Sequence, residues 1–325
     1  MLYFYLISIT IILIIVYLRI DRLANVINLY DIPNQQRKFH KKPTPLLGGT
    51  IFLIFLIFFY FFSFFFKVQI INQYTQFIIT ISSSIFFYIG FFDDKYEISP
   101  WKKLIFQILF SFLTIFLLKE NFLVEDLSFL SFDYSINLNN YSLIFTTFCL
   151  VIFFNALNMY DGVNGQAIIY SLIIFFVLLL KGFEFYFCIG LILFSLLFLI
   201  LNLNNKTFLG DNGIFVLSII ISLLIIKSYN DRLLYVDEIF LLMILPGVDM
   251  LRLFILRILK KKSPLVADRE HLHHYLIEKF NNNISLLILS ILSILPFIIF
   301  KFTNYYFSIS FFIISYIFLI LLKKK

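Results

Sequence analysis

Five short clusters of carboxylate, amide and imidazole side chains carry the chemistry that this sequence can offer. The clusters are Asp31 to His40, Asp93-Asp94-Lys95, Asn155 to Gly165, Gly210-Asp211-Asn212-Gly213, and Asp268 to His274. Neighbouring carboxylates such as Asp93 and Asp94 repel each other, and a divalent cation removes that cost. A carboxylate between glycines, as at Asp211, lets the backbone approach a phosphate closely. These residue types indicate phosphate-bearing ligands held with the help of a cation.

Each cluster also has a plainer structural interpretation. An Asp-Asp pair can be a solvated helix cap, and Asn-x-x-Asn-x-x-Asp-Gly can be a helix C-terminus followed by a turn. The three histidines of the last cluster could form a zinc site. However, His-x-His-His lacks the helical spacing of a zinc pair and contains no cysteine, so contact with a phosphate or diphosphate is favoured.

Apolar runs long enough to cross a membrane separate the clusters. A helix needs about 20 mostly apolar residues to cross a hydrocarbon core of ~30 Å. We find eleven such runs: 2–18, 47–66, 76–92, 103–118, 141–157, 165–180, 183–201, 213–228, 236–257, 284–300 and 305–322. Every cluster follows an odd-numbered run, so all five are expected on one face of the membrane.

Composition and charge lead to the same class of protein. The chain has 325 residues, of which 61% are hydrophobic and 14% charged, against ~45–50% and ~25% in soluble domains. This excludes a soluble enzyme, a disordered chain and a nucleic-acid binder. Most of the 26 Lys and Arg residues follow odd-numbered runs, so those loops are predicted to be cytoplasmic. The cytoplasmic face then carries about +9 and the outer face about −2.

The predicted fold is an all-α integral membrane protein with about eleven transmembrane helices. Residues 1–325 form one polytopic domain, with the N-terminus outside and the C-terminus in the cytoplasm. The predicted site is built from cytoplasmic loops 19–46, 93–103, 155–165, 202–213 and 258–283.

Smaller features add local expectations. Residues 20–30 have the apolar spacing of an amphipathic helix, and residues 129–139 alternate as in a short strand or hairpin. Pro246-Gly247 predicts a kink or break within the ninth run, with a proline tolerated within a membrane helix as the alternative. Cys149 and Cys188 are expected to be buried and not to form a disulfide.

Together the clusters resemble those of the polyprenyl-phosphate N-acetylhexosamine-1-phosphate transferases, which are of the glycosyltransferase family 4 type. The resemblance rests on three motifs in family order: Asp93-Asp94 with Ile98 and Lys103-Leu104-x-x-Gln107, Asn155-x-x-Asn158-x-x-Asp161-Gly162, and Ser263-Pro264-x-x-x-Asp268-Arg269-x-His271-Leu-His273-His274. The last motif resembles the branch that transfers GlcNAc-1-phosphate from UDP-GlcNAc to undecaprenyl phosphate. The pentapeptide branch would instead show three consecutive histidines and a nearby glutamate.

The resemblance implies a reaction and its partners. A HexNAc-1-phosphate, with GlcNAc preferred, moves from a UDP-sugar to polyprenyl phosphate, which releases UMP and starts a cell-envelope glycan. It also implies Mg²⁺ or Mn²⁺ as cofactor, a bacterial inner (cytoplasmic) membrane location with the active site facing the cytoplasm, and a homodimer. The lipid bilayer is a partner and nucleic acid is not.

The resemblance also implies roles for individual residues. Asp211 is the expected metal ligand and Asn158 the next candidate, while Asp93 and Asp94 are the expected catalytic carboxylates. One of these two would orient or deprotonate the lipid phosphate and the other would support the metal. A covalent route with Asp94 as nucleophile stays open, although direct displacement is favoured because a phosphate monoester is already a competent nucleophile.

The remaining expected site residues bind substrate. Asp161 is assigned to the nucleoside side of the donor and Arg269 to the sugar-phosphate. The phosphate-binding residues are expected to be Lys103, Arg37, Lys38, His40, His271, His273 and His274.

The sequence departs from the family pattern at two positions. Asn164 stands where many relatives have a second acid, which puts any role of that carboxylate in doubt, and Glu97 stands where some have Asp. Two other functions remain as alternatives: a membrane transporter of cations or lipid-linked sugars with a cytoplasmic ion site, and a polyprenyl-diphosphate phosphatase. The apolar interiors of the runs argue against the transporter, which needs polar residues along its path.

Overall fold

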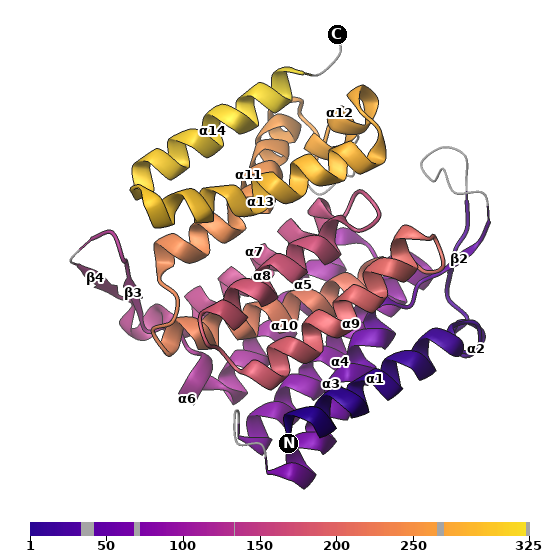
Figure 1. Cartoon of the computed structure of the whole chain (residues 1–325). Coiled ribbons are helices and arrows are strands. Elements are labelled where there is room, and N and C mark those ends of the chain that lie inside the picture. Colours follow the sequence, from indigo (N-terminus) through magenta and orange to yellow (C-terminus); the bar gives the residue numbers. More distant parts are fainter. Residues whose placement is uncertain (34–41, 68–71, 133, 265–269, 323–325) are drawn as a thin grey trace.

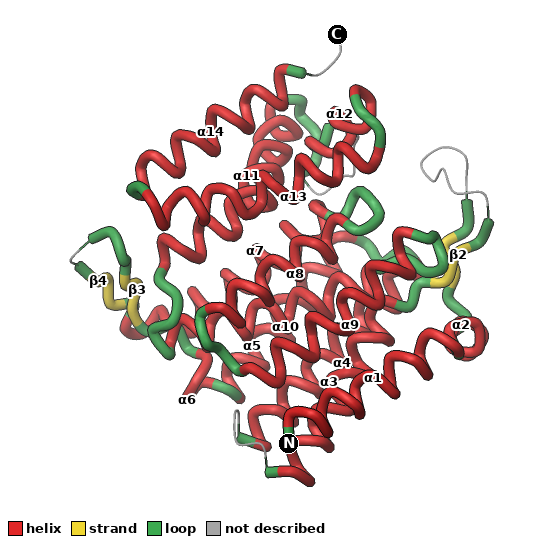
Figure 2. Tube along the Cα trace, viewed as in Figure 1, coloured by secondary structure: helices red, strands yellow, loops and turns green. Residues whose placement is uncertain are grey.

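The computed structural model describes residues 1–33, 42–67, 72–132, 134–264 and 270–322. Helix dominates these residues, with two short strand pairs (Figure 2). The helices are α1 (Leu2–Leu18), α2 (Ile20–Ile27), α3 (Gly48–Phe66), α4 (Gln73–Tyr96), α5 (Pro100–Leu117), α6 (Lys119–Phe122), α7 (Ser142–Tyr160), α8 (Gln166–Leu180), α9 (Phe185–Leu203), α10 (Gly210–Asn230), α11 (Val236–Leu259), α12 (Leu272–Lys279), α13 (Asn282–Phe302) and α14 (Tyr305–Leu321), with a 3₁₀ turn at Asn139–Tyr141. The strands are β1 (Tyr30–Asp31), β2 (Thr44–Pro45), β3 (Asp126–Ser128) and β4 (Ser135–Asn137).

Each of the eleven predicted apolar runs forms a helix, which confirms an all-α membrane protein. Among the described residues, eight helices are long and apolar enough to cross a membrane, and α1 with α2 makes a ninth if the bent pair is one span. The apolar helices α8 and α14 are shorter, with 15 and 17 residues. A count of eleven crossings and the orientation of the termini therefore stay predictions.

The smaller local expectations are borne out with two corrections. Helix α2 follows α1 at an angle of 67°. Strand β4 lies within the predicted residues 129–139 and pairs antiparallel with β3, which lies just before them. Both cysteines are free, but Cys149 is exposed on α7 while Cys188 is buried. The expectation of burial is wrong for Cys149, which is exposed and lines an apolar pocket together with residues of α10 and α11.

The second correction concerns the break expected at Pro246: α11 continues as one helix from Val236 to Leu259. A kink at this proline stays a prediction. Proline has no N–H to donate to the carbonyl four residues earlier, which here is that of Leu242. The Tyr170 hydroxyl of α8 donates to this carbonyl at 3.2 Å. A neighbouring helix thus supplies the missing donor, and no break occurs.

Helix α10 is the core of the bundle, since 94% of its apolar window is buried. It packs against α3, α4, α7 and α8. Gly90 of α4 makes close approach possible at the start of α10, because a Cβ at this position would lie 2.5 Å from the backbone nitrogen of Asn212. The first turn of α10, which carries Asp211, is therefore enclosed by neighbouring helices.

Two extended segments fix the entrance to α10 beside that of α3. The Phe208 N–H donates to the Pro45 carbonyl at 2.9 Å, and the Leu47 N–H donates to the Phe208 carbonyl at 3.2 Å. The Thr207 hydroxyl donates to the Pro45 carbonyl at 2.8 Å. The backbone that leads into the Gly-Asp-Asn-Gly cluster is thus held by the backbone that leads into α3.

Helices α11, α13 and α14 form a second group, and α12 packs on α13 and α14. Figure 1 shows this group along one side of the molecule, with the C-terminus there and the N-terminus on the opposite side. The β3–β4 hairpin lies at one end of the helices, and β2 lies at the other. The site described next is at the end that holds β1 and β2.

Candidate active site

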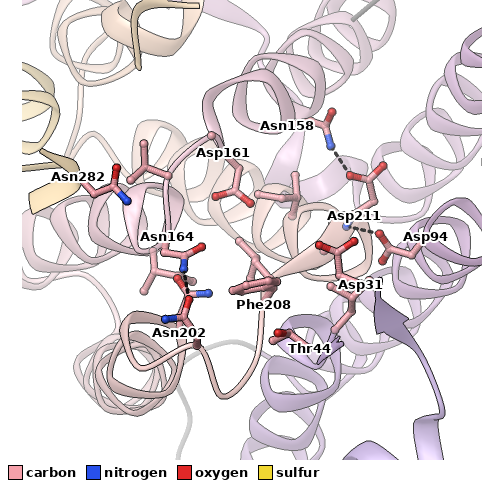
Figure 3. A pocket seen from close by; sticks show the side chains of 18 of the residues that line it. Asp31, Thr44, Asp94, Asn158, Asp161, Asn164, Asn202, Phe208, Asp211 and Asn282 are labelled. Atoms are coloured by element: carbon pink, nitrogen blue, oxygen red, sulfur yellow. Dashed lines mark hydrogen bonds between the residues drawn. The ribbon is translucent and has the colours of Figure 1, made fainter. Parts of the chain in front are cut away.

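A cavity of about 1110 Å³ opens where the five sequence clusters meet (Figure 3). Each cluster contributes to its lining: Asp31 from the first, Asp94 from the second, Asn158 to Asn164 from the third, Gly210 and Asp211 from the fourth, and His274 from the last. The predicted convergence of the clusters is therefore present in the structure. Asp93, Lys103, His271 and His273 are not among the lining residues.

Asp211 is held by an amide and an ammonium group. One carboxylate oxygen accepts a hydrogen bond of 2.7 Å from the Asn158 side-chain nitrogen. The other lies 2.5 Å from Lys103 Nζ, which is also 2.5 Å from a carboxylate oxygen of Asp93. Two carboxyl groups thus share one ammonium, and that of Asp211 also lines the cavity, where it is a candidate cation ligand.

Asp94 makes quite different contacts from its neighbour Asp93. Its carboxylate accepts from the backbone N–H groups of Asp211 at 2.9 Å and Asn212 at 3.0 Å, and from the Asn212 side chain at 2.7 Å. These N–H groups belong to the first turn of α10, which has no helical acceptors for them. The Asp94 carboxylate on α4 therefore caps α10, and its negative charge interacts favourably with the positive N-terminal end of the α10 dipole.

Asn212 extends this cap to a third helix. Its side-chain oxygen accepts from the Gly49 N–H at 2.8 Å, and its side-chain nitrogen bonds Asp94. Asn212 is fully buried. Helices α3, α4 and α10 are thereby tied together directly beneath Asp211.

Asp161 follows the last residue of α7, and its side chain points into the cavity between Asp211 and Asn164 (Figure 3). Burial, and after it the negative charge of Asp211, raises the pKa of this carboxyl to about 7. The next residue, Gly162, packs against the His273 ring, where a Cβ would lie only 2.0 Å from a ring carbon. The glycine is therefore required by the close approach of the imidazole.

The three histidines at 271, 273 and 274 occupy different surroundings. His274 lines the cavity, whereas His271 and His273 are buried. Burial lowers the pKa of His273 to about 3, and the neighbouring His274 and His271 lower it as well, so this ring is neutral at pH 7. His274 is thus the histidine of this cluster that lines the cavity, and direct phosphate contact stays a prediction for all three rings.

Other expected residues lie outside the described part of the chain, namely Arg37, Lys38, His40 and Arg269. Lys42, from the same loop as the first three, lines the cavity. Asn164, the departure from the family pattern, donates to the Asn205 side-chain oxygen at 2.8 Å.

Several lining residues were not singled out from the sequence. They are Thr44, Phe208, Asn202, Asn204, Asn205 and Asn282. The run Asn202-Leu-Asn-Asn205 lies within the predicted loop 202–213, and its three amides were a usable signal. The cavity thus has a carboxylate-rich part around Asp211 and an amide-rich part around Asn205.

The described residues contain no group of three or more His, Cys, Asp or Glu side chains placed to hold a metal ion. A site that relies on fewer such side chains still suits Mg²⁺, which usually keeps several waters and takes one or two carboxylates plus substrate phosphates. Asp211 and Asn158 supply a carboxylate and an amide group side by side.

Comparison with known proteins relates this arrangement to a family. Residues 76–229, which include three of the five clusters, match the glycosyl transferase family 4 sequence model. An undecaprenyl-phosphate alpha-N-acetylglucosaminyl 1-phosphate transferase from Salmonella typhi is 24% identical over 266 residues, which cover 78% of this chain and 70% of that protein. The probable undecaprenyl-phosphate N-acetylglucosaminyl 1-phosphate transferase of Bacillus subtilis (strain 168) is 28% identical over 267 residues, 79% of this chain and 72% of that protein.

A third relative, the undecaprenyl-phosphate alpha-N-acetylglucosaminyl 1-phosphate transferase of Haemophilus influenzae, is 26% identical over 270 residues. These cover 78% of this chain and 73% of that protein. The relatives thus span most of the chain, including parts beyond the matched region. The matched region and these relatives together support a place for this chain in glycosyl transferase family 4.

Proposed function

We propose that this protein transfers GlcNAc-1-phosphate from UDP-GlcNAc to undecaprenyl phosphate at the cytoplasmic face of a bacterial inner membrane. One observation carries the proposal: all five polar clusters line a single cavity at one end of the membrane helices. The names of the relatives supply the substrates. The volume of about 1110 Å³ exceeds the ~300–1,000 Å³ typical of small-molecule sites, and a nucleotide sugar needs that room.

The reaction requires positioning and charge neutralisation more than covalent help. An oxygen of the lipid phosphate attacks the donor phosphorus that carries the sugar. The bond from this phosphorus to the bridging oxygen breaks, and UMP leaves with that oxygen. Because the attacking group and the diphosphate are both anionic, the site must offset their repulsion.

The chain's own residues divide this work. Asp211 and Asn158 would hold a Mg²⁺ ion, which when bound neutralises charge on the diphosphate. Lys103 holds the second oxygen of Asp211 and fixes the orientation of the carboxylate. Asp94 fixes the first turn of α10 through its backbone, so we assign it to positioning. Asp93 does not line the cavity and pairs with Lys103, so we assign it to holding Lys103 beside Asp211.

The amide-rich part of the cavity suits the uncharged portions of the donor. Asn164, Asn202 and Asn205 offer both donors and acceptors without charge. Asp161 lies between this part and Asp211 (Figure 3), consistent with a place on the nucleoside side of the diphosphate. Asn164 retains an oxygen and adds a donor where an acid would have only acceptors.

The experiment uses purified protein in lipid nanodiscs with undecaprenyl phosphate, UDP-GlcNAc and Mg²⁺. We expect release of UMP and formation of the lipid-linked diphosphate sugar, and Asp211→Ala abolishes both. The matched control is Asp231→Ala, which removes a carboxylate from the other end of α10 and leaves activity unchanged. Unchanged UMP release in Asp211→Ala would contradict the site assignment.

Donor and metal are tested in the same assay. UDP-GalNAc and other UDP-HexNAc donors compete with UDP-GlcNAc, and we expect the GlcNAc donor to give the highest kcat/KM. Removal of divalent cations with EDTA stops turnover, and Mg²⁺ restores it. No UMP from any UDP-HexNAc would overturn the proposed function.

A further inference from the structure

A buried ion pair lies within α11, away from the cavity lining. Asp249 is 6% exposed and forms an ion pair with Arg252, one turn later on the same helix, at 2.7 Å. Charged side chains within an apolar membrane helix are costly and usually mark a function. Neither residue lines the cavity, and the proposed reaction gives neither of them a direct role.

A tyrosine from the last helix completes this pair. The Tyr316 hydroxyl of α14 donates to Asp249 at 2.7 Å and accepts from Arg252 Nε at 2.7 Å. Tyr316 is itself buried, at 5% exposure. The three side chains form a closed hydrogen-bonded group that joins α11 to α14.

The same group reaches the segment that carries the histidines. A terminal nitrogen of Arg252 donates to the Glu270 backbone carbonyl at 2.6 Å. The second carboxylate oxygen of Asp249 lies 3.5 Å from His271 Nδ1. Arg252 therefore contacts Glu270, and Asp249 lies close to His271; these are the two residues that precede α12.

Helix α12 needs such an anchor because it has eight residues, far below the length at which an isolated helix is stable in water. His271 is its N-cap residue, and its first turn contains His273 and His274. His273 packs on Gly162, and His274 lines the cavity. A shift at His271 would thus move the one histidine of this segment that faces the substrates.

We propose that Asp249, Arg252 and Tyr316 are positioning residues that hold the start of α12 so that His274 faces the cavity. They touch no substrate and act through His274. The link to activity rests on the proposed transferase function, whereas the anchoring of α12 does not.

The first test measures backbone hydrogen–deuterium exchange of α12 in Tyr316→Phe, which removes a single hydroxyl and keeps the Asp249–Arg252 pair. We expect exchange to be about tenfold faster, the scale of a lost hydrogen bond to a charged group. The control is Tyr5→Phe, which also removes a buried hydroxyl, one that donates to the Tyr186 carbonyl at 2.6 Å. Unchanged exchange of α12 in Tyr316→Phe would overturn the proposal.

The second test is a double-mutant cycle on UMP release. If Tyr316 acts through His274, Tyr316→Phe lowers kcat/KM in the parent protein and has no further effect in His274→Ala. Additive losses would show a general structural effect and refute the positioning role. The exchange measurement needs no substrate, so it decides the anchoring of α12 even if the proposed reaction fails.

Discussion

Replacing Asp94 with asparagine tests whether the two adjacent aspartates do different work. The Asp94 carboxylate accepts three hydrogen bonds, two from the α10 backbone and one from Asn212. Asparagine offers one oxygen, and its nitrogen would face N–H donors. Each hydrogen bond to a charged group contributes ~1.5–3 kcal/mol, and a charge at a helix N-terminus adds ~0.3–1 kcal/mol. We therefore expect Asp94→Asn to destabilise the protein by about 2–4 kcal/mol.

The matched control is Asp93→Asn. Asp93 bonds Lys103, and Lys103 keeps its second partner, Asp211, in this variant. The cap of α10 is untouched, and an amide at position 93 still offers an oxygen to Lys103, so the free energy of unfolding should fall by less than in Asp94→Asn. Both variants should lose UMP release, but Asp94→Asn should lose more stability than Asp93→Asn.

The assay combines thermal unfolding in detergent, followed by intrinsic fluorescence, with UMP release at saturating substrates. The expected shift of the unfolding midpoint in Asp94→Asn is about 5 °C downward. An inactive Asp94→Asn that unfolds with the parent protein would refute the capping argument and favour a chemical role, including the covalent one. An equal loss of stability in Asp93→Asn would also refute it.

Three further predictions concern other parts of the site and its scaffold. Burial and Asp211 raise the pKa of Asp161 to about 7, so the stability that the protonated carboxyl confers is lost as pH rises through 7. The parent protein should therefore lose more thermal stability than Asp161→Asn between pH 5 and 8, and parallel curves of unfolding midpoint against pH would contradict this. Gly162→Ala places a Cβ against the His273 ring and should cost about 1–3 kcal/mol of unfolding free energy, which His273→Ala restores; no rescue would contradict it. Asp237 accepts from the Ser131 N–H at 2.8 Å and its hydroxyl at 2.7 Å, so Asp237→Ala should speed hydrogen exchange around Ser131 while UMP release stays unchanged, and lost activity would contradict the separation of the two ends.

The sequence predicted the fold well because the bilayer imposes a length on every apolar run. The parity of the five clusters then predicted that Asp31, Asp94, Asp161, Asp211 and His274 share one cavity. These predictions depend on chain length and helix direction alone. No knowledge of side-chain contacts was needed for them.

The contacts inside the site were beyond such reasoning. Asp93 and Asp94 are equivalent in a sequence, yet successive residues of a helix point about 100° apart, so one meets Lys103 and the other the start of α10. The pairing of Asp249 with Arg252, one turn later, follows from helix spacing, but its contacts with Tyr316 and His271 join distant segments. Spacing along one helix does not reveal a partner on another.

The hydrogen bond from the Tyr170 hydroxyl to the Leu242 carbonyl has a consequence for biosynthesis. A membrane protein is made from its N-terminus, so α8 is in the bilayer before α11 leaves the ribosome. Tyr170, whose hydroxyl donates to the Leu242 carbonyl that Pro246 leaves without a donor, is therefore synthesised before Leu242. Once α11 packs against α8, the Leu242 carbonyl has a donor within the protein and needs no water in the hydrocarbon.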